Sequence, residues 1–298
     1  MAWSAEVSTQ PDPWEREGLP KPGTTLLGRY KLERPLARGG MAMIYRGHDP
    51  VLDRSVAVKV MPERLKTERS HARFLREARL AAQVSHPNVV ETYDAGVLES
   101  GAPFLVMELL DGETLYQLLH REGKLPLHQA VNVLEAVLSG VAAAHKRGVV
   151  HRDLKPSNVL LLADAPHVKV IDFGLSKDLR DKGPRLTGPR EALGTPSYMS
   201  PEQVMAEPVD ARTDVYGTGV LFYEMITGER AFPKPAKGKL VKDVFAMILR
   251  DSPAPPTEVD PSLPEAADIF VRKAMAKRPD DRYPSADAMR VAVNTLRA

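Results

Sequence analysis

The feature that most constrains this chain is a short polar cluster between two apolar runs at residues 149–162. Residues 149–150 and 159–162 are apolar, so we expect two short buried strands that hold the polar loop rigidly between them. A single loop carboxylate is usually a solvated charge, but here several polar side chains are grouped. The group comprises Asp153, Lys155, Asn158 and, after the next apolar run, Asp172. Such a set can position a hydroxyl, a phosphate and a divalent metal ion together.

The motifs around these side chains resemble those of a known family. Residues 151–158 are His-Arg-Asp-Leu-Lys-Pro-Ser-Asn, and residues 172–174 are Asp-Phe-Gly. This order resembles the catalytic core of the protein kinases. Its details are most similar to the eukaryotic-like (Hanks-type) serine/threonine kinases of bacteria, and the resemblance runs from Gly28 to Arg297.

The resemblance implies an α+β fold with two lobes. The smaller N-terminal lobe would hold an antiparallel β-sheet and one main helix, and the larger lobe would be mainly helical. Residues 1–26 are rich in proline, glycine and charge without a regular period, so we expect a flexible tail there. The small lobe is expected at 27–108, the hinge at 109–113 and the large lobe at 114–298, with ATP in the cleft between the lobes.

Composition narrows the classes of function. The 298 residues are 43% hydrophobic and 27% charged, which is ordinary for a globular protein. A net charge of +2 favours neither nucleic acid nor an anionic membrane as a partner. Cysteine is absent, which excludes disulfides and thiolate sites. No apolar run approaches the roughly 20 residues of a membrane span and no signal peptide is recognisable, so we expect a soluble chain. The absence of cysteine fits a reducing compartment, and we expect the cytoplasm.

A turn of small residues at 36–47 predicts a hairpin whose backbone amides can lie over phosphates. Against the kinase pattern Gly-x-Gly-x-x-Gly, this chain has Ala37, Gly39 and Ala42. Only the central glycine is kept. Because an alanine is strained at positive φ, we expect ATP binding to survive but to be weaker.

A lysine and a glutamate form the next candidate pair. Residues 55–61 alternate like a strand, and Lys59 occupies the lysine position of the kinase motif Val-Ala-Ile-Lys. Residues 68–84 have the period of a helix, with core-facing positions at Phe74, Leu75, Ala78, Ala81 and Ala82. Glu77 on that helix is placed to meet Lys59, and the pair would hold the lysine on the α and β phosphates.

Further nucleotide contacts are implied by the resemblance alone. The residues that would touch ATP, besides Lys59 and Glu77, are Leu36, Ala37, Arg38, Gly39, Gly40, Ile44, Ala57 and Leu160. Met107 would border the adenine pocket, and the backbone of Glu108 and Leu110 would bind the adenine. Met107 and Glu108 end the second strand of a hairpin predicted at residues 89–97 and 104–108, and Leu110 lies in the turn after it.

The segment at 172–202 is rich in lysine and arginine and lacks periodicity, so we expect it to be mobile. The resemblance identifies it as the activation segment. Thr187 is the first candidate for an activating phosphate, because nearby arginines could pair with the phosphate and order the loop. Ser176 is a second candidate, and Thr195 is expected beside the substrate at the catalytic loop.

The C-terminal part is predicted to be helical. Apolar stripes predict helices at 127–147, 210–227, 240–249, 263–275 and 285–296. Asp214, near the start of one of them, could cap its amides or, by resemblance, hold the backbone of residues 151–152. By resemblance too, Glu202 pairs with Arg282.

Roles in phosphoryl transfer follow from the resemblance. Asp153 would accept or orient the proton of the attacking hydroxyl, and Lys155 would stabilise the γ-phosphate as it moves. Asn158 and Asp172 would hold Mg²⁺, or Mn²⁺ in its place. The lysine two residues after Asp153 resembles serine/threonine rather than tyrosine kinases. Arg152, beside that aspartate, suggests control by phosphorylation of the activation segment.

Three functions fit these features. The first is an active serine/threonine protein kinase in signalling, with protein substrates, autophosphorylation of its activation loop and, by resemblance to bacterial relatives, homodimerisation through the small lobe. The second is a non-catalytic module of the same fold, which only the two alanines of the phosphate loop favour. The third is a small-molecule kinase. The full catalytic set argues against the second, and the segment at 194–202 with Arg282 argues against the third, because they would form a platform for an extended peptide.

Overall fold

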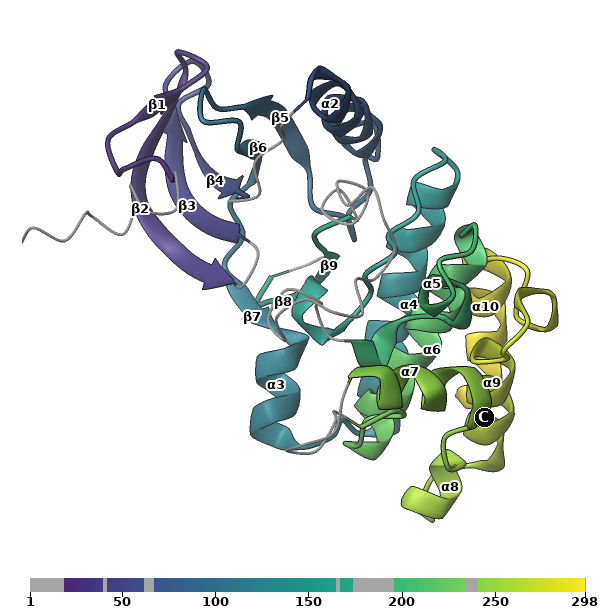
Figure 1. The fold of residues 1–298 in the computed structure, drawn as a ribbon. Coiled ribbons are helices and arrows are strands. Elements are labelled where there is room, and N and C mark those ends of the chain that lie inside the picture. Colours follow the sequence, from purple (N-terminus) through teal and green to yellow (C-terminus); the bar gives the residue numbers. More distant parts are fainter. Residues whose placement is uncertain are drawn as a thin grey trace, which may run out of the picture. The chain divides into compact units, whose positions relative to one another are not determined.

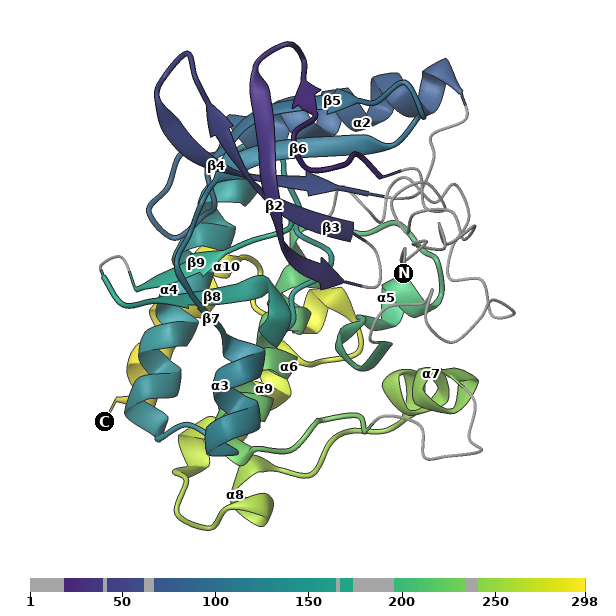
Figure 2. The same cartoon turned by 90° about the vertical axis from the view of Figure 1, so that its left-hand side faces the viewer.

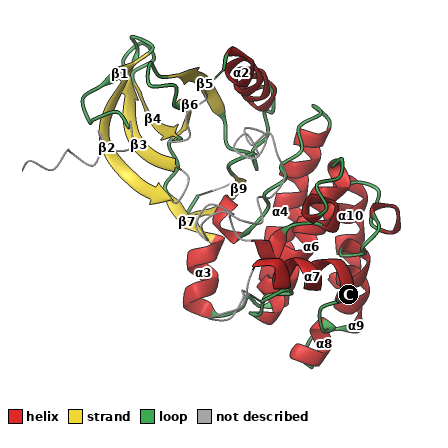
Figure 3. Ribbon diagram, viewed as in Figure 1, coloured by secondary structure: helices red, strands yellow, loops and turns green. Residues whose placement is uncertain are grey.

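The computed structural model describes residues 19–39, 42–61, 67–164, 167–173, 196–233 and 241–297 (Figure 1). Two compact units divide the chain. The first contains the residues up to Leu75 together with Tyr93–Leu109, and the second contains Arg76–Thr92 and the residues from Leu110 onward. Strands dominate the first unit and helices dominate the second (Figure 3).

The first unit is built on a β-sheet. Within the described ranges this sheet has six strands in the order β1-β2-β3-β4-β6-β5. Their bounds are Thr25–Leu26 (β1), Tyr30–Gly39 (β2), Ala42–Asp49 (β3), Arg54–Val60 (β4), Thr92–Val97 (β5) and Pro103–Glu108 (β6). Strands β1 to β4 pair antiparallel in sequence, and β4 pairs antiparallel with β6. The register of β2 shifts between Pro35 and Ala37, since a proline has no N–H to offer to the ladder.

Alternation along these strands separates two faces of the sheet. One face forms the core of the first unit, where the side chains of Tyr45, Val56, Val58, Val60, Phe104 and Val106 are at most 1% exposed. Valine, phenylalanine and tyrosine favour strands because they pack well on a pleated surface. The intervening residues of β4 and β6 lie on the opposite face.

Order in the first unit begins earlier than the expected tail boundary at residue 26. Leu19 and Leu26 are buried in the core, and β1 pairs with β2. The buried hydroxyl of Tyr45 donates a hydrogen bond to the carbonyl of Pro20 at 2.8 Å, which satisfies a polar group that burial would otherwise penalise. Residues 19–26 therefore belong to the folded unit, and residues 1–18 lie outside the described chain.

Helix α2 spans Glu68–Ala82, and the division between the two units falls within it. Its buried stripe contains Phe74, Ala78 and Ala81. Ala82, expected to face the core, is exposed. It follows Ala81 directly, so it is rotated by about 100° away from the stripe.

The second unit contains a three-stranded sheet in the order β7-β8-β9, with bounds Gly112–Thr114, Val159–Leu162 and Val168–Val170. Strand β8 is the expected strand after the polar loop. Residues 149–150, on the other side of that loop, are irregular rather than a strand. The N–H of Val149 donates to the carbonyl of Ala144 at 3.0 Å, at the end of the preceding helix. Strand β7 pairs with β8 where only a turn was expected.

Helices make up the rest of the second unit (Figure 2). Their bounds are Leu115–Glu122 (α3), Leu127–His145 (α4), Pro201–Val204 (α5), Ala211–Thr227 (α6), Val241–Arg250 (α7), Pro256–Val259 (α8), Glu265–Ala274 (α9) and Ala286–Ala292 (α10). Short 3₁₀ turns occur at Pro156–Asn158, Pro196–Tyr198, Pro279–Asp281 and Val293–Leu296. The helices expected from the apolar stripes are all present, and the last of them continues beyond α10 as the final 3₁₀ turn.

Helix α6 is the centre of this unit, since α4, α9 and α10 all contact it. It is buried on every side from Thr213 to Thr227, as expected for a largely apolar core helix. Asp210 caps its N-terminus by accepting from the N–H of Arg212, and Gly228 ends it in the left-handed conformation with φ 75°.

Helix α4 is long and apolar enough to cross a membrane by length and composition, although no such run was expected. Its apolar residues, among them Leu134, Val137, Leu138 and Val141, are fully buried in the core of the second unit. The apolar stripe is therefore used in packing against α6 and α10.

Candidate active site

The polar loop after α4 is held by one buried carboxylate. Asp214, in the first turn of α6, is 1% exposed and accepts hydrogen bonds from the backbone N–H groups of His151 at 2.7 Å and Arg152 at 2.8 Å. The imidazole Nε2 of His145, at the end of α4, lies 2.7 Å from the same carboxylate. Asp210, not Asp214, caps α6. Asp214 therefore fixes the loop rather than its own helix.

His151 fixes the loop from the inside. Its Nε2 lies 2.9 Å from the carbonyl of Ile171, and its Nδ1 lies 3.2 Å from the backbone nitrogen of Asp153. A carbonyl only accepts and an N–H only donates, so Nε2 carries the proton and Nδ1 is the acceptor. Burial lowers the pKa of His151, which agrees with a neutral ring. The ring also packs 4.7 Å from that of Phe173.

Two polar side chains of the loop, Lys155 and Asn158, converge on Asp153. The Nζ atom of Lys155 donates to the Asp153 carboxylate at 2.6 Å. The amide nitrogen of Asn158 donates to the carbonyl of Asp153 at 2.8 Å and to its carboxylate at 3.3 Å. Asp153 and Lys155 keep 21% and 19% of their side chains exposed. A carboxylate and an ammonium are thus held together in a place that solvent and a substrate can reach.

Asp172 is brought near this loop by the pairing of β8 and β9. Val159 is paired with Val170, and the N–H of Ile171 donates to the carbonyl of Asn158 at 3.0 Å. Asp172 is the next residue, and its φ of 64° is unusual for a residue with a side chain. A backbone held in this region often marks a functional position.

The chemistry of these donors fits a divalent metal ion. The amide nitrogen of Asn158 is engaged with Asp153, which leaves its amide oxygen as the atom suited to a metal. Asp172 supplies carboxylate oxygen, and Mg²⁺ prefers such oxygen ligands, completing its shell with water and phosphate.

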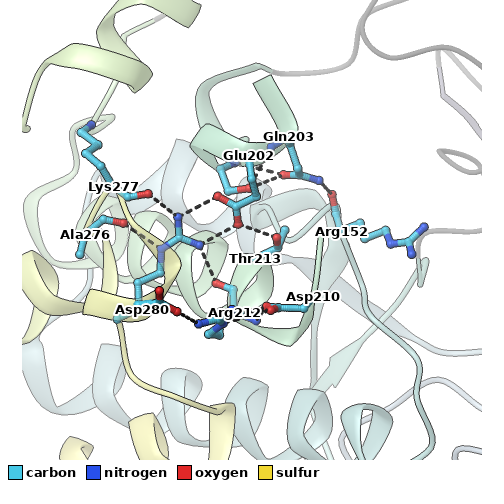
Figure 4. Close-up of polar contacts among 11 residues, drawn as sticks. Arg152, Glu202, Gln203, Asp210, Arg212, Thr213, Ala276, Lys277 and Asp280 are labelled. Carbon is cyan, nitrogen blue, oxygen red and sulfur yellow. Dashed lines mark hydrogen bonds and ion pairs between the residues drawn. The ribbon is translucent and has the colours of Figure 1, made fainter. Parts of the chain in front are cut away.

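A buried ion pair between Glu202 and Arg282 joins the helices that support the loop (Figure 4). The guanidinium of Arg282 donates to both carboxylate oxygens of Glu202, at 2.7 and 2.8 Å. The Thr213 hydroxyl donates to the same carboxylate at 2.6 Å. Burial alone would raise the pKa of Glu202, but the Arg282 and Thr213 hydrogen bonds outweigh it and lower the pKa. Gln203, next to this pair, donates from its amide to the carbonyl of Arg152 at 2.8 Å and so connects it to the loop.

The nucleotide candidates of the first unit form a row across its sheet. Ala37 is paired with Ile44, Ile44 with Lys59, and Ala57 with Met107. Directly paired residues share a face, as do Lys59 and Ala57, which are two residues apart. This is the face opposite the core. Leu36, Arg38 and Gly39 lie in β2 beside the row, and Glu108 ends β6.

The two alanines of the phosphate loop are not strained. Neither Ala37 nor Ala42 has a positive φ, and Ala42 is paired with Gly39 in the β2–β3 ladder. The expectation of weaker ATP binding assumed a left-handed backbone there, so its physical basis is absent.

The remaining residues predicted to contact the nucleotide lie apart from this row. Glu77 lies in α2, Leu110 follows β6 in the second unit, and Leu160 lies in β8. The pairing of Glu77 with Lys59 stays a prediction. Gly40, Ser176, Thr187 and Thr195 lie outside the described residues.

Sequence reasoning missed three residues that support the loop, namely His145, Gln203 and Thr213. Each of them contacts its partner only in the folded chain, and no sequence motif includes both residues. His145 is 69 positions from Asp214, and Gln203 is 51 positions from Arg152. Single polar residues on helices carry no signal of such contacts.

Known proteins resemble this chain in both sequence and structure. The family model described as "Protein kinase domain" matches residues 30–292. The probable serine/threonine-protein kinase SCO3848 of Streptomyces coelicolor is 42% identical over 270 residues, covering 89% of this chain and 39% of that protein. Serine/threonine-protein kinase PknB of Mycobacterium tuberculosis is 39% identical over 269 residues, covering 89% and 42%.

Serine/threonine-protein kinase pkn3 of Myxococcus xanthus is 38% identical over 283 residues, covering 92% of this chain and 51% of that protein. The chain thus spans about two fifths to one half of the length of these relatives. Among solved structures, the PknI kinase domain of Mycobacterium tuberculosis has a TM-score of 0.75 at 25% identity, covering 93% of this chain and 99% of that domain.

Proposed function

This chain belongs to the protein kinase family, as a catalytic domain of the bacterial serine/threonine type, and we propose that it is active. The proposed reaction is transfer of the γ-phosphate of ATP to serine or threonine hydroxyls of proteins, including its own activation segment. The observation that carries the proposal is the 2.6 Å contact between Lys155 and Asp153 in a loop fixed by Asp214.

Asp153 is proposed to bind and orient the acceptor hydroxyl and to take its proton. The carboxylate is exposed enough to be reached, and the Asn158 amide holds it in place. Lys155 is proposed to lie between this carboxylate and the transferred phosphoryl group, where its charge stabilises the equatorial oxygens. Its location two residues after the aspartate supports a serine or threonine acceptor.

Asn158 and Asp172 are proposed to hold the divalent ion, with Mg²⁺ as the physiological choice and Mn²⁺ as a substitute. When bound, the ion supplies positive charge that offsets the charge on the transferred group. The chain's own contribution is to fix the amide oxygen of Asn158 through the hydrogen bond to Asp153 and to present Asp172 beside it.

Nucleotide binding in the first unit is proposed for the row that includes Ala37, Ile44 and Lys59. A lysine centred in a row of small and apolar side chains can pair with phosphates while the apolar neighbours contact the ring. Ala57 and Met107, paired on the adjacent strands, extend the apolar surface toward the backbone of Glu108. Glu77 is proposed to hold Lys59 in its working position.

We also propose that two copies of the chain form a homodimer through the small lobe. Val51 and Leu52, at the turn between β3 and β4, are 69% and 56% exposed, and Leu27 is 57% exposed. Large apolar side chains in such positions are suited to a contact between copies. A concentration-dependent mass in solution that Leu52→Asp abolishes would support the dimer, and a constant monomer mass would exclude it.

We also propose that the domain acts in the cytoplasm, where ATP is available.

The deciding experiment is intact mass followed by peptide mapping after incubation with ATP and Mg²⁺. Wild-type chain and the Asp153→Asn variant are compared, each with and without a generic basic protein. Phosphate on the chain or on the added protein, present only with Asp153, is the expected result. The mapping also tests Thr187, Ser176 and Thr195 as acceptors.

Two other outcomes correspond to the alternative functions. Measurable ATP binding with no phosphate on any protein would favour a non-catalytic module. Phosphate transfer only after a small molecule is added would favour a small-molecule kinase. Repeating the reaction with Mn²⁺ tests the choice of metal.

A further inference from the structure

Helix α2 carries a row of exposed arginines to which no role is assigned above. Arg69, Arg76 and Arg79 are exposed, whereas Phe74 and Ala78 of the same helix are buried. Successive residues of an α-helix are turned by about 100°, so Arg69 and Arg76 lie within about 20° of each other and Arg79 lies about 60° from Arg76. The three arginines therefore share the side of α2 opposite its buried stripe. We call them the arginine stripe.

The arginine stripe has no counter-ion within the described chain. None of its three guanidinium groups forms an ion pair or a hydrogen bond with a residue that the structure describes. Exposed charges on a helix are commonly stabilised by an opposite charge three or four positions away. No aspartate or glutamate lies at that spacing from any of the three arginines. The missing counter-ion is therefore a property of the sequence and not of one side-chain conformation.

The spacing of these arginines destabilises the helix that carries them. Arg76 and Arg79 are three positions apart, and like charges at that spacing repel. Arg69 lies in the first turn, where the helix dipole disfavours a cation. Helix α2 contains four arginines and two glutamates, an excess of positive charge as large as the +2 of the whole chain. An anion bound along the arginine stripe would offset this repulsion.

We infer that the arginine stripe is a docking surface for an acidic segment of a partner protein. A guanidinium pairs with a carboxylate through two parallel hydrogen bonds, so each arginine of the stripe suits a glutamate or aspartate side chain. The stripe runs along about 15 Å of the helix, which matches about five residues of an extended chain. A short acidic segment is therefore long enough to engage all three arginines.

The charge of the whole chain favours a protein as the occupant. A net charge of +2 provides little long-range attraction to nucleic acid or to an anionic membrane. The positive charge is instead concentrated on one helix face, which suits a partner of similar extent. This docking needs no ATP and goes beyond the proposed function.

The test adds a fluorescently labelled octaglutamate peptide, blocked at both ends, to the whole chain at low ionic strength. Fluorescence anisotropy measures the affinity, and the amide signals of the ¹⁵N-labelled chain locate the binding. We expect saturable binding that shifts the signals of the arginine stripe and weakens with added salt, because exposed charges are screened. The triple variant Arg69→Gln, Arg76→Gln, Arg79→Gln should bind about 10- to 100-fold more weakly, since one exposed ion pair contributes about two- to five-fold.

A second triple variant removes the same charge from elsewhere on the surface. Arg147, Arg250 and Arg272 are exposed and form no ion pair with the described residues, and they lie after α4, in α7 and in α9. Replacing these three by glutamine should change the affinity by less than about two-fold. The stripe variant should melt at or above the wild-type temperature, because it loses repulsion and no contact. Octaglutamine should not bind to the wild-type chain.

Three results with octaglutamate would each overturn the inference. These are no saturable binding, equal weakening by the two triple variants, and signal shifts confined to residues outside α2. Tighter binding of a thymidine oligonucleotide, or of vesicles of phosphatidylcholine and phosphatidylserine, that is lost in the stripe variant would identify nucleic acid or a membrane as the occupant instead.

The Asp153→Asn variant separates this inference from the proposed function. We expect it to bind octaglutamate as tightly as the wild-type chain, although it transfers no phosphate. Wild-type chain that binds the peptide but transfers no phosphate would support the docking surface and count against the proposed function alone. Phosphate transfer by a wild-type chain that does not bind the peptide would overturn only the docking surface.

Discussion

Glu202 and Arg282, eighty positions apart in the sequence, are joined by two hydrogen bonds of 2.7 and 2.8 Å between buried side chains. Arg282 donates in addition to the carbonyls of Ala276, Lys277 and Arg212. One guanidinium therefore joins α5, the start of α6 and the segment after α9, and its own hydrogen-bonding capacity is fully used.

Removing one partner of this pair should be costly. In Glu202→Gln the charge of Arg282 stays buried without its counter-ion, so we expect a loss of about 3–5 kcal/mol in the free energy of unfolding. Urea denaturation followed by circular dichroism measures it. The double variant Glu202→Met, Arg282→Met should lose less than the two single losses combined, because it leaves no buried charge. Additive losses would contradict this account.

The same pair predicts a dependence on acid. The pKa of Glu202 is lower in the folded than in the unfolded chain, where a glutamate titrates near about 4.3. The pair's contribution is therefore complete above that pH and is lost as the pH falls through the lower, folded pKa. The stability difference between wild type and Glu202→Gln should shrink below about pH 4.3. A difference that stays constant down to the acid transition would exclude the linkage.

The contact between Asp214 and the loop predicts a defect in catalysis. The N–H groups of His151 and Arg152 donate to different oxygens of Asp214, so asparagine at position 214 would place an N–H₂ group opposite one of them. We expect kcat to fall by about 100-fold, because a small displacement of reacting groups has effects of that order. The control is Asp210→Asn, which alters the cap of the same helix but not the loop. It should change stability by about 1 kcal/mol or less and leave kcat nearly unchanged.

Much of this fold could be predicted because its signals are local. Helical periods located α4, α6 and α9, and alternation located β4. Elements fixed only by distant partners could not be located in this way. Strand β7 is three residues long and exists through its pairing with β8, and residues 149–150 look like a strand but complete a helix end instead.

The site follows the same rule. Asp153, Lys155 and Asn158 are close in sequence, so their shared motif is enough to group them. His145 is 69 positions from the carboxylate that it contacts, and its lone imidazole resembles any other helical histidine. Whether φ of Ala37 is positive or negative could not be predicted either, because it depends on how β2 pairs with β3.

Replacing the two alanines by glycine should not improve ATP binding. Ala37 and Ala42 are both paired in the β2–β3 ladder and neither has a positive φ, so a glycine relieves no strain there and adds freedom to the unfolded chain. We expect Ala37→Gly, Ala42→Gly to lose about 1–2 kcal/mol of stability, with ATP affinity within about two-fold of wild type. Calorimetric titration and thermal melting measure both. A gain of about ten-fold in affinity would show that the methyl groups do obstruct the nucleotide.

The neutral ring of His151 predicts a second, milder dependence on pH. A proton on Nδ1 would face the N–H of Asp153, so the folded chain resists protonation that the unfolded chain accepts near about pH 6.5.

Burial lowers the pKa of His86 as well, helped by the charges of Lys146 and Lys169. Both lowered values mean that stability is complete above about pH 6.5 and falls as the pH decreases, by about 1.4 kcal/mol per unit for each histidine until its folded pKa is reached. Unfolding free energies measured between about pH 7.5 and about pH 5 should fall with pH, and His86→Asn and His151→Asn should each make this fall smaller. A flat profile in the wild-type chain would mean that His151 is protonated in the folded state, and the Nδ1 acceptor assigned here would be wrong.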